Sequence, residues 1–440
     1  MNPELQRNLW LTITPRRLVL DGLLIAVVLL LSVGLPAGLR EGRMLDHARY
    51  LYLFFAVLLA SRDAAVCIVA EIRDRTWDQQ RLSALGAWSM LWGKLVGATA
   101  SRWLAALICL AAIVAVSPRD TALRLHELVL IALVAQVAAL LASLIGIRRR
   151  AARSRMEAYL YQGVGLAAAV GFMLQWPSTY TDEWSIWWGW RIGIFWLATA
   201  SAVAAIGWAI VGCHRLLRRE LLMQNAPYVW LGFLAFVAVY AAGWEIESNR
   251  AAFRLLLATA SLAAVTYVAI VLDAHDAVHY RRVAALWRAG ATGDAMRLLP
   301  TWVTAFAATA IGWMALLVAI ATTPEPIDGI DRGATLAAAL GFLARDCALL
   351  LLLQFRLRRG AEAAGLFLLF VAYWVLPTLA LQLGAVTWPF WPMVSDAAAG
   401  IGSQSAPGYA AVAAGWVQAA LFMWLALRAL RRPASAAPAS

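Results

Sequence analysis

Residues 71–95, EIRDRTWDQQRLSALGAWSMLWGKL, separate two long apolar runs with a charged, amphipathic stretch. The charged side chains prevent this stretch from crossing a bilayer, because each would exchange water for hydrocarbon. Its apolar side chains, among them Leu82, Leu85 and Trp88, disfavour full exposure to water. We therefore expect the stretch to lie along the membrane surface between two membrane-spanning helices.

The composition assigns the whole chain to one class of protein. Of the 440 residues, 63% are hydrophobic and 14% are charged, which is typical of polytopic membrane proteins and not of soluble multi-domain proteins. A helix needs about 20 apolar residues to cross the hydrocarbon core of a bilayer. The runs that meet this requirement are residues 18–38, 50–71, 95–117, 126–147, 158–176, 192–213, 228–245, 253–273, 301–322, 335–355, 364–384 and 409–428. We predict an all-α polytopic membrane protein with about twelve transmembrane helices.

The positions of the arginines predict how these helices are oriented. Arginines cluster in alternate loops, within residues 73–81, 148–155, 215–219, 281–297, 356–359 and 428–432. Because arginine-rich loops are retained on the cytoplasmic side, we expect an integral protein of the cell (inner) membrane with both termini in the cytoplasm. The net charge of +12 then reflects topology, and no nucleic-acid partner is expected. Lys94 is the only lysine of the chain. We attribute this preference for arginine over lysine to genome composition in the first place, and to function only after that.

The order of features repeats along the chain and predicts two similar six-helix halves, residues 1–220 and 221–440. Each half has two spans, a basic segment, two spans, an arginine cluster, a span, a tryptophan-bearing segment, a last span and a second arginine cluster. In this alignment Lys94 falls opposite Arg297. Such internal duplication is common among transporters, with the substrate path where the repeats meet. No stretch between the apolar runs is long enough for a soluble catalytic domain, so we do not expect an enzyme.

The charged stretch resembles the cytoplasmic coupling region of type-2 ABC exporter permeases. In that family a glutamate opens the region, a Gly-Thr-Leu-Glu run and leucines follow, a Thr-Pro-Leu-Ser turn comes next, and Gly-Lys-Leu starts the third span. The residues that match without a gap are Glu71, Thr76, Asp78, Leu82, Leu85, Gly93, Lys94 and Leu95. The residues that depart are Arg75 in place of the glycine, Gln79 and Gln80 in place of leucines, and Ala84 in place of the turn proline.

The resemblance implies that this chain forms the transport path and that a partner subunit hydrolyses ATP. It implies an amphipathic helix at residues 5–10, a coupling helix near residues 79–90 that docks on a separate ATPase subunit, and a short re-entrant segment between the fifth and sixth spans. Two six-span permeases usually face each other in that family, and this chain looks like both in one, so two ATPase subunits are expected. ATP and Mg²⁺ would bind to those subunits, and no cofactor is expected on this chain.

Coupling of this kind requires a rigid segment with an apolar face for the membrane and charges for a polar socket on the partner. The residues expected to form this coupling site are Glu71, Arg73, Asp74, Arg75, Thr76, Asp78, Arg81, Leu82, Leu85 and Lys94. The corresponding stretch of the second half, residues 274–299, is basic but lacks the family pattern. If this stretch is a second ATPase-docking site that has lost the family pattern, the two ATP-driven movements of the permease would be unequal. The alternative is that both stretches are solvated basic loops.

Ionisable residues inside the predicted spans form a second group of candidates, because such residues are costly in lipid and usually face a protein interior or a cavity. They are Asp21, Arg62, Asp63, Arg102, Asp273, Arg345 and Asp346. Arg345 and Asp346 are neighbours in sequence, as are Arg62 and Asp63, and neighbours on a helix point about 100 degrees apart. We therefore expect their partners on other spans. They either form ion pairs that fix helix packing or contact a substrate or a proton.

Three further motifs give weaker signals. Residues 86–94 resemble a phosphate-binding loop only superficially, because the spacing of glycine and lysine is wrong. His275 and His279 have the i, i+4 spacing of a helical metal site, but no glutamate base accompanies them and the four cysteines lie in or beside apolar runs, so no metal is expected. The tryptophans of residues 176–191 and 388–391 either anchor the chain at the membrane interface or gate an amphipathic cargo.

The predicted function is the transmembrane permease subunit of an ATP-driven exporter that moves an unidentified substrate outward. The main alternative is an ion-coupled secondary transporter. Its candidate proton carriers are Asp21, Asp63, Asp273 and Asp346. Against it, the segment between the second and third spans lacks the glycine and aspartate pattern of major facilitator proteins. A membrane enzyme acting on a lipid-linked sugar is a third class, for which only Asp182 and Glu183 offer acids in the outer segment.

Overall fold

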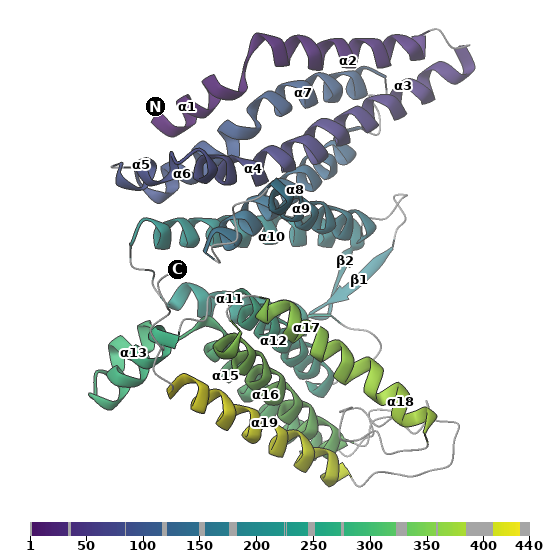
Figure 1. Cartoon of the computed structure of the whole chain (residues 1–440). Coiled ribbons are helices and arrows are strands. Elements are labelled where there is room, and N and C mark those ends of the chain that lie inside the picture. Colours follow the sequence, from purple (N-terminus) through teal and green to yellow (C-terminus); the bar gives the residue numbers. More distant parts are fainter. Residues whose placement is uncertain are drawn as a thin grey trace. The chain divides into compact units, whose positions relative to one another are not determined.

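The computed structural model describes residues 2–33, 37–83, 85–116, 121–148, 155–175, 183–223, 225, 227–244, 251–273, 277–322, 332–357, 360–383 and 408–431. These residues form helices and one two-stranded sheet (Figure 1). The chain divides into two compact units. Unit 1 comprises Met1–Ser185 and Arg191–Asn225, and unit 2 comprises Ile186–Trp190 and Ala226–Ser440. That the two units arose by duplication stays a prediction.

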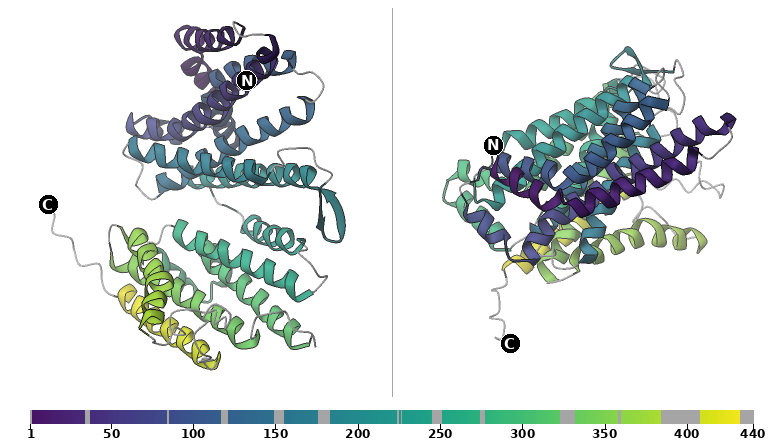
Figure 2. Two further views of the ribbon diagram at one scale, coloured as in Figure 1. Left: turned by 90° about the vertical axis from the view of Figure 1, so that its right-hand side faces the viewer. Right: turned by 90° about the horizontal axis from the view of Figure 1, so that it is seen from above.

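Unit 1 is built from long apolar helices that lie side by side (Figure 2). In chain order the helices are α1 (Pro3–Thr12), α2 (Pro15–Val33), α3 (Ala37–Tyr52), η1 (Leu53–Leu59), α4 (Ala60–Arg73), α5 (Trp77–Leu82), α6 (Ala87–Trp92), η2 (Gly93–Gly97), α7 (Ala98–Val116), α8 (Thr121–Arg148), α9 (Arg155–Gln175) and α10 (Ile194–Glu220). The η elements are π-helical turns inside two continuous helices, α3–η1–α4 and α6–η2–α7. Helix α8 packs against α4, α9 and α10. Small residues such as Gly165, which lies against Ala135 and Ala139, allow close approach of the helices.

Unit 2 has the same order of long helices. They are α11 (Tyr228–Ala242), α12 (Ala251–Leu272), α13 (Ala277–Arg288), α14 (Thr292–Arg297), α15 (Thr301–Thr322), α16 (Arg332–Arg356), α17 (Ala361–Phe370), η3 (Val371–Val375), α18 (Leu376–Gln382) and α19 (Gly408–Arg431). Helix α16 packs along α19, and α12 packs along α15. As in unit 1, short helices follow the second long helix: α13 and α14 take the place that α5 has in unit 1.

The helices confirm that the chain is an all-α polytopic membrane protein. Within the described residues, nine helices are long and apolar enough to cross a membrane. Helices also occupy the other three predicted spans, at α2, α9 and α11, but α11 is only 15 residues long and α2 carries Arg16, Arg17 and Asp21. Because most of these helices are apolar on all sides, their outer faces suit lipid. The count of twelve crossings stays a prediction.

The expected coupling helix near residues 79–90 is two short helices instead. Helix α5 ends at Leu82 and α6 begins at Ala87, while Ser83 and Gly86 have extended backbone conformations. Serine and glycine both form helix interiors less readily than alanine. Helix α6 continues without a break through η2 into α7, so the third long helix begins before the apolar run that predicted it.

A β-hairpin lies where a re-entrant segment was expected. Its strands are β1 (Trp184–Trp187) and β2 (Trp190–Gly193). The two turn residues, Trp188 and Gly189, have φ angles of 54° and 78°, which suit a tight two-residue hairpin turn. Aromatic and β-branched residues favour strands. Predictions for Ala84, residues 176–182, His275, Asp276 and residues 388–391 lie outside the described residues.

Candidate functional site

The end of α4 is closed by residues of the charged stretch. The Arg75 N–H donates to Ile72 O at 3.2 Å, and the Thr76 N–H donates to Glu71 O at 2.9 Å. These two bonds are those of a Schellman cap, which ends a helix and reverses the chain. Arg75 has a φ of 57°, a left-handed conformation that glycine adopts most readily. The cap leads the chain from α4 directly into α5.

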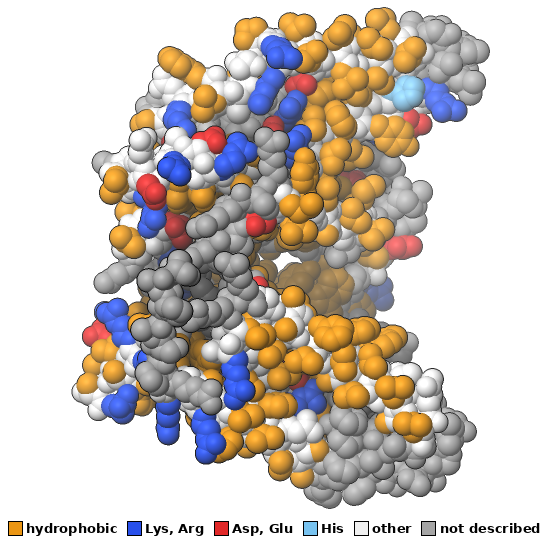
Figure 3. Space-filling model, in the orientation of Figure 1, with side chains coloured by type: hydrophobic (Ala, Val, Ile, Leu, Met, Phe, Trp, Pro, Cys, Tyr) orange, Lys and Arg blue, Asp and Glu red, His pale blue; other side chains and the backbone are white. Residues whose placement is uncertain are grey.

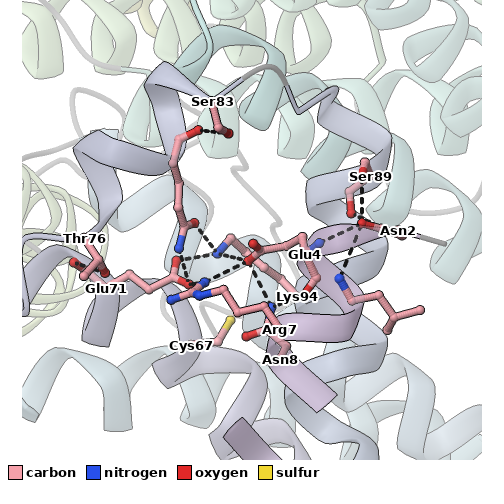
Figure 4. A network of polar contacts seen from close by, with 12 residues as sticks. Asn2, Glu4, Arg7, Asn8, Cys67, Glu71, Thr76, Ser83, Ser89 and Lys94 are labelled. Atoms are coloured by element: carbon pink, nitrogen blue, oxygen red, sulfur yellow. Dashed lines mark hydrogen bonds and ion pairs between the residues drawn. The ribbon is translucent and has the colours of Figure 1, made fainter. Parts of the chain in front are cut away.

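Lys94 lies at the centre of a buried polar cluster (Figure 4). Its side chain is 1% exposed. The ammonium donates to Glu71 Oε2, to Gln80 Oε1 at 3.0 Å and to Glu4 Oε1 at 3.3 Å. It also lies 5.2 Å from the centre of the Trp77 ring. Because an ammonium has three N–H donors, these acceptors use all of its hydrogen-bonding capacity.

The two carboxylates of the cluster have further donors. Glu71 Oε1 accepts from Gln80 Nε2 at 2.8 Å and from Arg7 Nη1 at 3.0 Å. Glu4 Oε1 accepts from Asn8 Nδ2 at 2.9 Å and from Arg7 Nη1 at 3.3 Å. Two carboxylates and two cations leave the cluster without net charge. Ionised groups remain stable in a buried site when they are paired and hydrogen-bonded in this way.

Two glycines of η2 allow α1 to reach the cluster. A Cβ atom on Gly93 would lie 2.5 Å from Glu4 Cγ, and a Cβ atom on Gly97 would lie 2.7 Å from Asn8 Cβ. The side chains of Glu4 and Asn8 are buried at this contact. Only residues without a Cβ atom permit α1 to lie this close to η2. Gly93 and Gly97 therefore form the surface against which α1 packs.

Both ends of α1 are attached to the same long helix. At its start, Asn2 Nδ2 donates to Ser89 O at 2.6 Å and Ser89 Oγ donates to Asn2 Oδ1 at 2.7 Å. At its end, Thr12 Oγ1 donates to Gly97 O at 3.0 Å. Trp10 on the other side of α1 is 78% exposed. Helix α1 therefore turns Glu4 and Asn8 toward the protein and Trp10 and Leu11 outward.

The predicted coupling residues fall into two groups. Those with exposed side chains are Arg73, Asp74, Arg75, Asp78 and Leu82. Those that are buried or partly buried are Glu71, Thr76, Arg81, Leu85 and Lys94. Asp78 is 83% exposed and Leu82 is 88% exposed. Only the first group can make extensive contact with another protein, while Glu71 and Lys94 connect the segment to the helices beneath it.

Helix α10 supports the segment from a second direction. Arg81 Nε donates to Glu220 O at 2.9 Å, at the last residue of α10. The ring of Trp88 stacks on that of His214, with centroids 4.0 Å apart and an interplanar angle of 14°. The segment is therefore attached to the first and last helices of unit 1 as well as to its own neighbours.

The ionisable residues within the spans of unit 1 form a separate cluster. Arg102 Nη1 donates to Asp21 at 2.8 and 2.9 Å, and Arg102 Nε donates to Asp63 Oδ2 at 3.1 Å. The Arg62 guanidinium lies 5.8 Å from the centre of the Tyr159 ring. The triad joins α2, α4 and α7.

Unit 2 has a buried ion pair of a different kind. Arg345 Nη2 lies 2.8 Å from Asp346 Oδ1, and Arg345 also has a partner on another span, as expected, because its Nη1 donates to Gln418 Oε1 at 3.3 Å. The long arginine side chain bends toward the carboxylate, with its guanidinium 4.5 Å from the centre of the Phe342 ring. Asp346 Oδ2 also accepts from Tyr267 at 2.6 Å and Tyr373 at 2.5 Å, which lie on α12 and η3. The carboxylate thus has partners on its own helix and on two others.

Among the described residues, a hydrogen-bonded cap connects the second and third long helices of unit 2. Asp273 Oδ2 accepts from the Thr301 N–H at 2.8 Å and the Thr301 hydroxyl at 2.6 Å, which caps the start of α15. Arg297, which aligns with Lys94, is 69% exposed and lies 3.8 Å from Asp294. The segment between the second and third long helices is therefore attached by a buried ion-pair cluster in unit 1 and, within the part of unit 2 that the structure describes, by an aspartate cap.

Sequence reasoning identified only part of the buried cluster. It included Glu71 and Lys94 but missed the residues that α1 contributes. These are Glu4, Arg7 and Asn8. Two signals were present: the i, i+4 spacing of Gly93 and Gly97, which favours close helix contact, and the placement of the only lysine at position 94.

No family model matches this chain, and neither a curated protein nor a solved structure gives a significant match to it.

Proposed function

We propose that the chain is the membrane permease subunit of an ABC-type exporter, and that a separate ATPase subunit binds the exposed side of residues 73–82. ATP and Mg²⁺ bind to that subunit, and the chain itself catalyses no reaction. The substrate, whose chemistry is unidentified, moves outward across the cell (inner) membrane. The arginine distribution supports cytoplasmic termini.

One observation carries the proposal: a short helix is exposed on one side and rigidly attached on the other to helices that can cross the membrane. The buried cluster joins α5, through Gln80, to α4 through Glu71 and to the third long helix through Lys94. A solvated loop would absorb a displacement by rotating about its backbone. A segment held by buried ion pairs transmits the displacement to both long helices.

The backbone supports the family resemblance at a residue where the sequence departs from it. Arg75 stands where the family pattern has glycine, and its φ is 57°. An L-residue other than glycine loses roughly 1–2 kcal/mol in this conformation. The same turn is therefore built with a residue that adds a positive charge to the exposed surface at a cost in backbone strain.

The ion-coupled alternative has weaker support. Asp21 and Asp63 share Arg102, and Asp346 contacts Arg345. These arrangements support a role in helix packing.

Removing two exposed charges is expected to weaken ATPase binding while leaving the fold intact. In the double variant R73Q/R75G, the glycine removes one charge and relieves the positive φ of Arg75, and Arg81 is kept because it donates to Glu220 O. Loss of two surface ion pairs to a partner predicts binding weaker by on the order of tenfold. The measurements are co-purification of the ATPase subunit with the full-length chain and the ATP hydrolysis rate of the complex in vesicles.

The double variant R282Q/R288Q is the matched control, because it removes two exposed arginines from α13, which lies outside the proposed docking surface. It is expected to retain the ATPase. Equal retention by R73Q/R75G and wild type would show that residues 73–82 are not the docking surface. Transport by vesicles that contain the chain without any ATPase, and that stops when a protonophore removes the proton gradient, would support the secondary transporter instead.

A further inference from the structure

We propose that α13 of unit 2 lies on the membrane surface and binds the phosphate-bearing headgroups of anionic lipids. This surface lies on a different segment from the coupling site, and the proposal does not depend on the exporter function. Helix α13 has 12 residues, too few to cross a bilayer. Its neighbours α12 and α15 are both long and apolar enough to cross one, so α13 begins and ends near one membrane surface.

The first turn of α13 is attached to the helices that enter the membrane. His279 Nε2 lies 2.8 Å from Leu298 O, and the Tyr280 hydroxyl accepts from Trp302 Nε1 at 2.8 Å. The rings of Tyr280 and Phe355 meet edge-on with centroids 5.3 Å apart. Burial raises the pKa of Tyr280 above its ordinary value, so its hydroxyl stays protonated. These contacts fix both the position of α13 and its rotation about its own axis.

The orientation of Tyr280 identifies the side of α13 that faces the membrane. At 3.6 residues per turn, Trp287 points to the same side as Tyr280, and Val278 points to the side opposite Trp287. Trp287 is nevertheless 52% exposed, because α13 extends beyond the helices that cover Tyr280. A tryptophan in this position suits the interface between headgroups and acyl chains.

Arg281 and Arg288 lie on one flank of this tryptophan, about 100–120 degrees from it around the helix, whereas Arg282 points to the side of Val278. Helix α13 contains Arg281, Arg282 and Arg288 and no acidic residue, and all three arginines are exposed. Arg281 Nε donates to a carbonyl oxygen in the last turn of α19 at 3.1 Å, a turn that also carries Arg428 and Arg431. Basic side chains gather at the end of unit 2 where α13 lies (Figure 3). The surface is complementary in charge to a layer of anionic phosphates.

The charge pattern distinguishes α13 from the coupling segment of unit 1. That segment mixes Arg73 and Arg75 with Asp74 and Asp78, and charges of both signs suit a specific protein socket. Helix α13 carries one sign of charge together with an exposed tryptophan, which is the pattern of helices that lie on anionic bilayers. The two units therefore present surfaces suited to different partners.

Spin labels on opposite sides of α13 test its placement. The full-length chain carries W287C or V278C and is reconstituted in phosphatidylcholine vesicles with or without phosphatidylglycerol; the labelled wild-type chain corrects for native cysteines. With phosphatidylglycerol, the label at position 287 is expected to be more accessible to oxygen than to a water-soluble nickel chelate, and the label at position 278 the reverse. Equal accessibility of both labels to the chelate, or shielding of position 287 from both reagents by protein, overturns the proposal.

The charge contribution is tested by the preference of the chain for spin-labelled phosphatidylglycerol over phosphatidylcholine. In R288Q this preference is expected to fall by roughly fivefold. R288K keeps the charge and should retain the preference, and so should R282Q, whose side chain lies on the side of Val278, and R73Q/R75G. An unchanged preference in R288Q, or an equal loss in R288K, overturns the role of the arginine charge.

Discussion

Replacing Lys94 with methionine is expected to destabilise unit 1 by about 3–5 kcal/mol, because removal of one member of a buried ion pair leaves the other charge uncompensated. Methionine retains an unbranched apolar chain but leaves Glu4 and Glu71 without the ammonium that joins them. The expected result is a lower midpoint of thermal unfolding in detergent. Faster hydrogen exchange is expected in residues 2–12 and 71–94, which the cluster connects.

The substitution R73M is the matched control for Lys94, because it also replaces a paired cation with methionine. The side chains of Arg73 and Asp74 are 49% and 58% exposed, and an exposed ion pair contributes about 0–1 kcal/mol. The double variant E71Q/K94M should be more stable than the sum of its single variants predicts, because it removes both charges together. Equal destabilisation by K94M and R73M would contradict the assignment of Lys94 to a buried cluster.

The second large effect is expected at Gly93, where alanine should displace α1. The added Cβ atom would lie 2.5 Å from Glu4 Cγ and 2.9 Å from the Glu4 backbone carbon, so rotation of the side chain cannot remove the clash. Overpacking of this kind costs typically about 1–3 kcal/mol. Loss of contact along α1 is expected to increase hydrogen exchange in residues 2–12.

The substitution G86A is the control for this displacement. No atom lies within 4 Å of a Cβ atom built on Gly86, and its φ of −72° suits any residue. Alanine gains up to about 1 kcal/mol over glycine in a helix interior, so a net loss at Gly93 must come from the clash with α1. Unchanged exchange of residues 2–12 in G93A would show that α1 does not depend on the glycine surface.

The fold class and the position of each long helix were predictable, because apolar length alone decides whether a helix suits the bilayer. Each predicted span overlaps a helix of the described residues. The break between α5 and α6 was not predicted, although Ser83 and Gly86 were visible as weak helix formers. The β-hairpin at Trp188 and Gly189 was missed because its tryptophans were interpreted through their interfacial preference, not through their strand propensity.

The candidate site was predictable only in part, because side chains from distant segments complete it. Glu71 and Lys94 attracted attention through a local pattern, yet that pattern suggested an exposed surface. The structure buries them, and Glu4, which is 90 residues from Lys94 in the chain, supplies a third member of the cluster. Arg345 and Asp346 also show that the sequence does not give side-chain contacts. Helical geometry gives the direction of each Cβ atom, but it does not give the path by which the long arginine side chain reaches the neighbouring carboxylate.

Local composition was sufficient to define a chain of apolar helices with a charged segment after the second of them, because transfer of each segment to lipid depends on its own residues. The pairing of charges depended on folding, because an ionised side chain becomes stable in a buried site only when a particular partner reaches it. Lys94 found its partners on α1, α4 and α5 because two glycines on its own helix allowed α1 to approach.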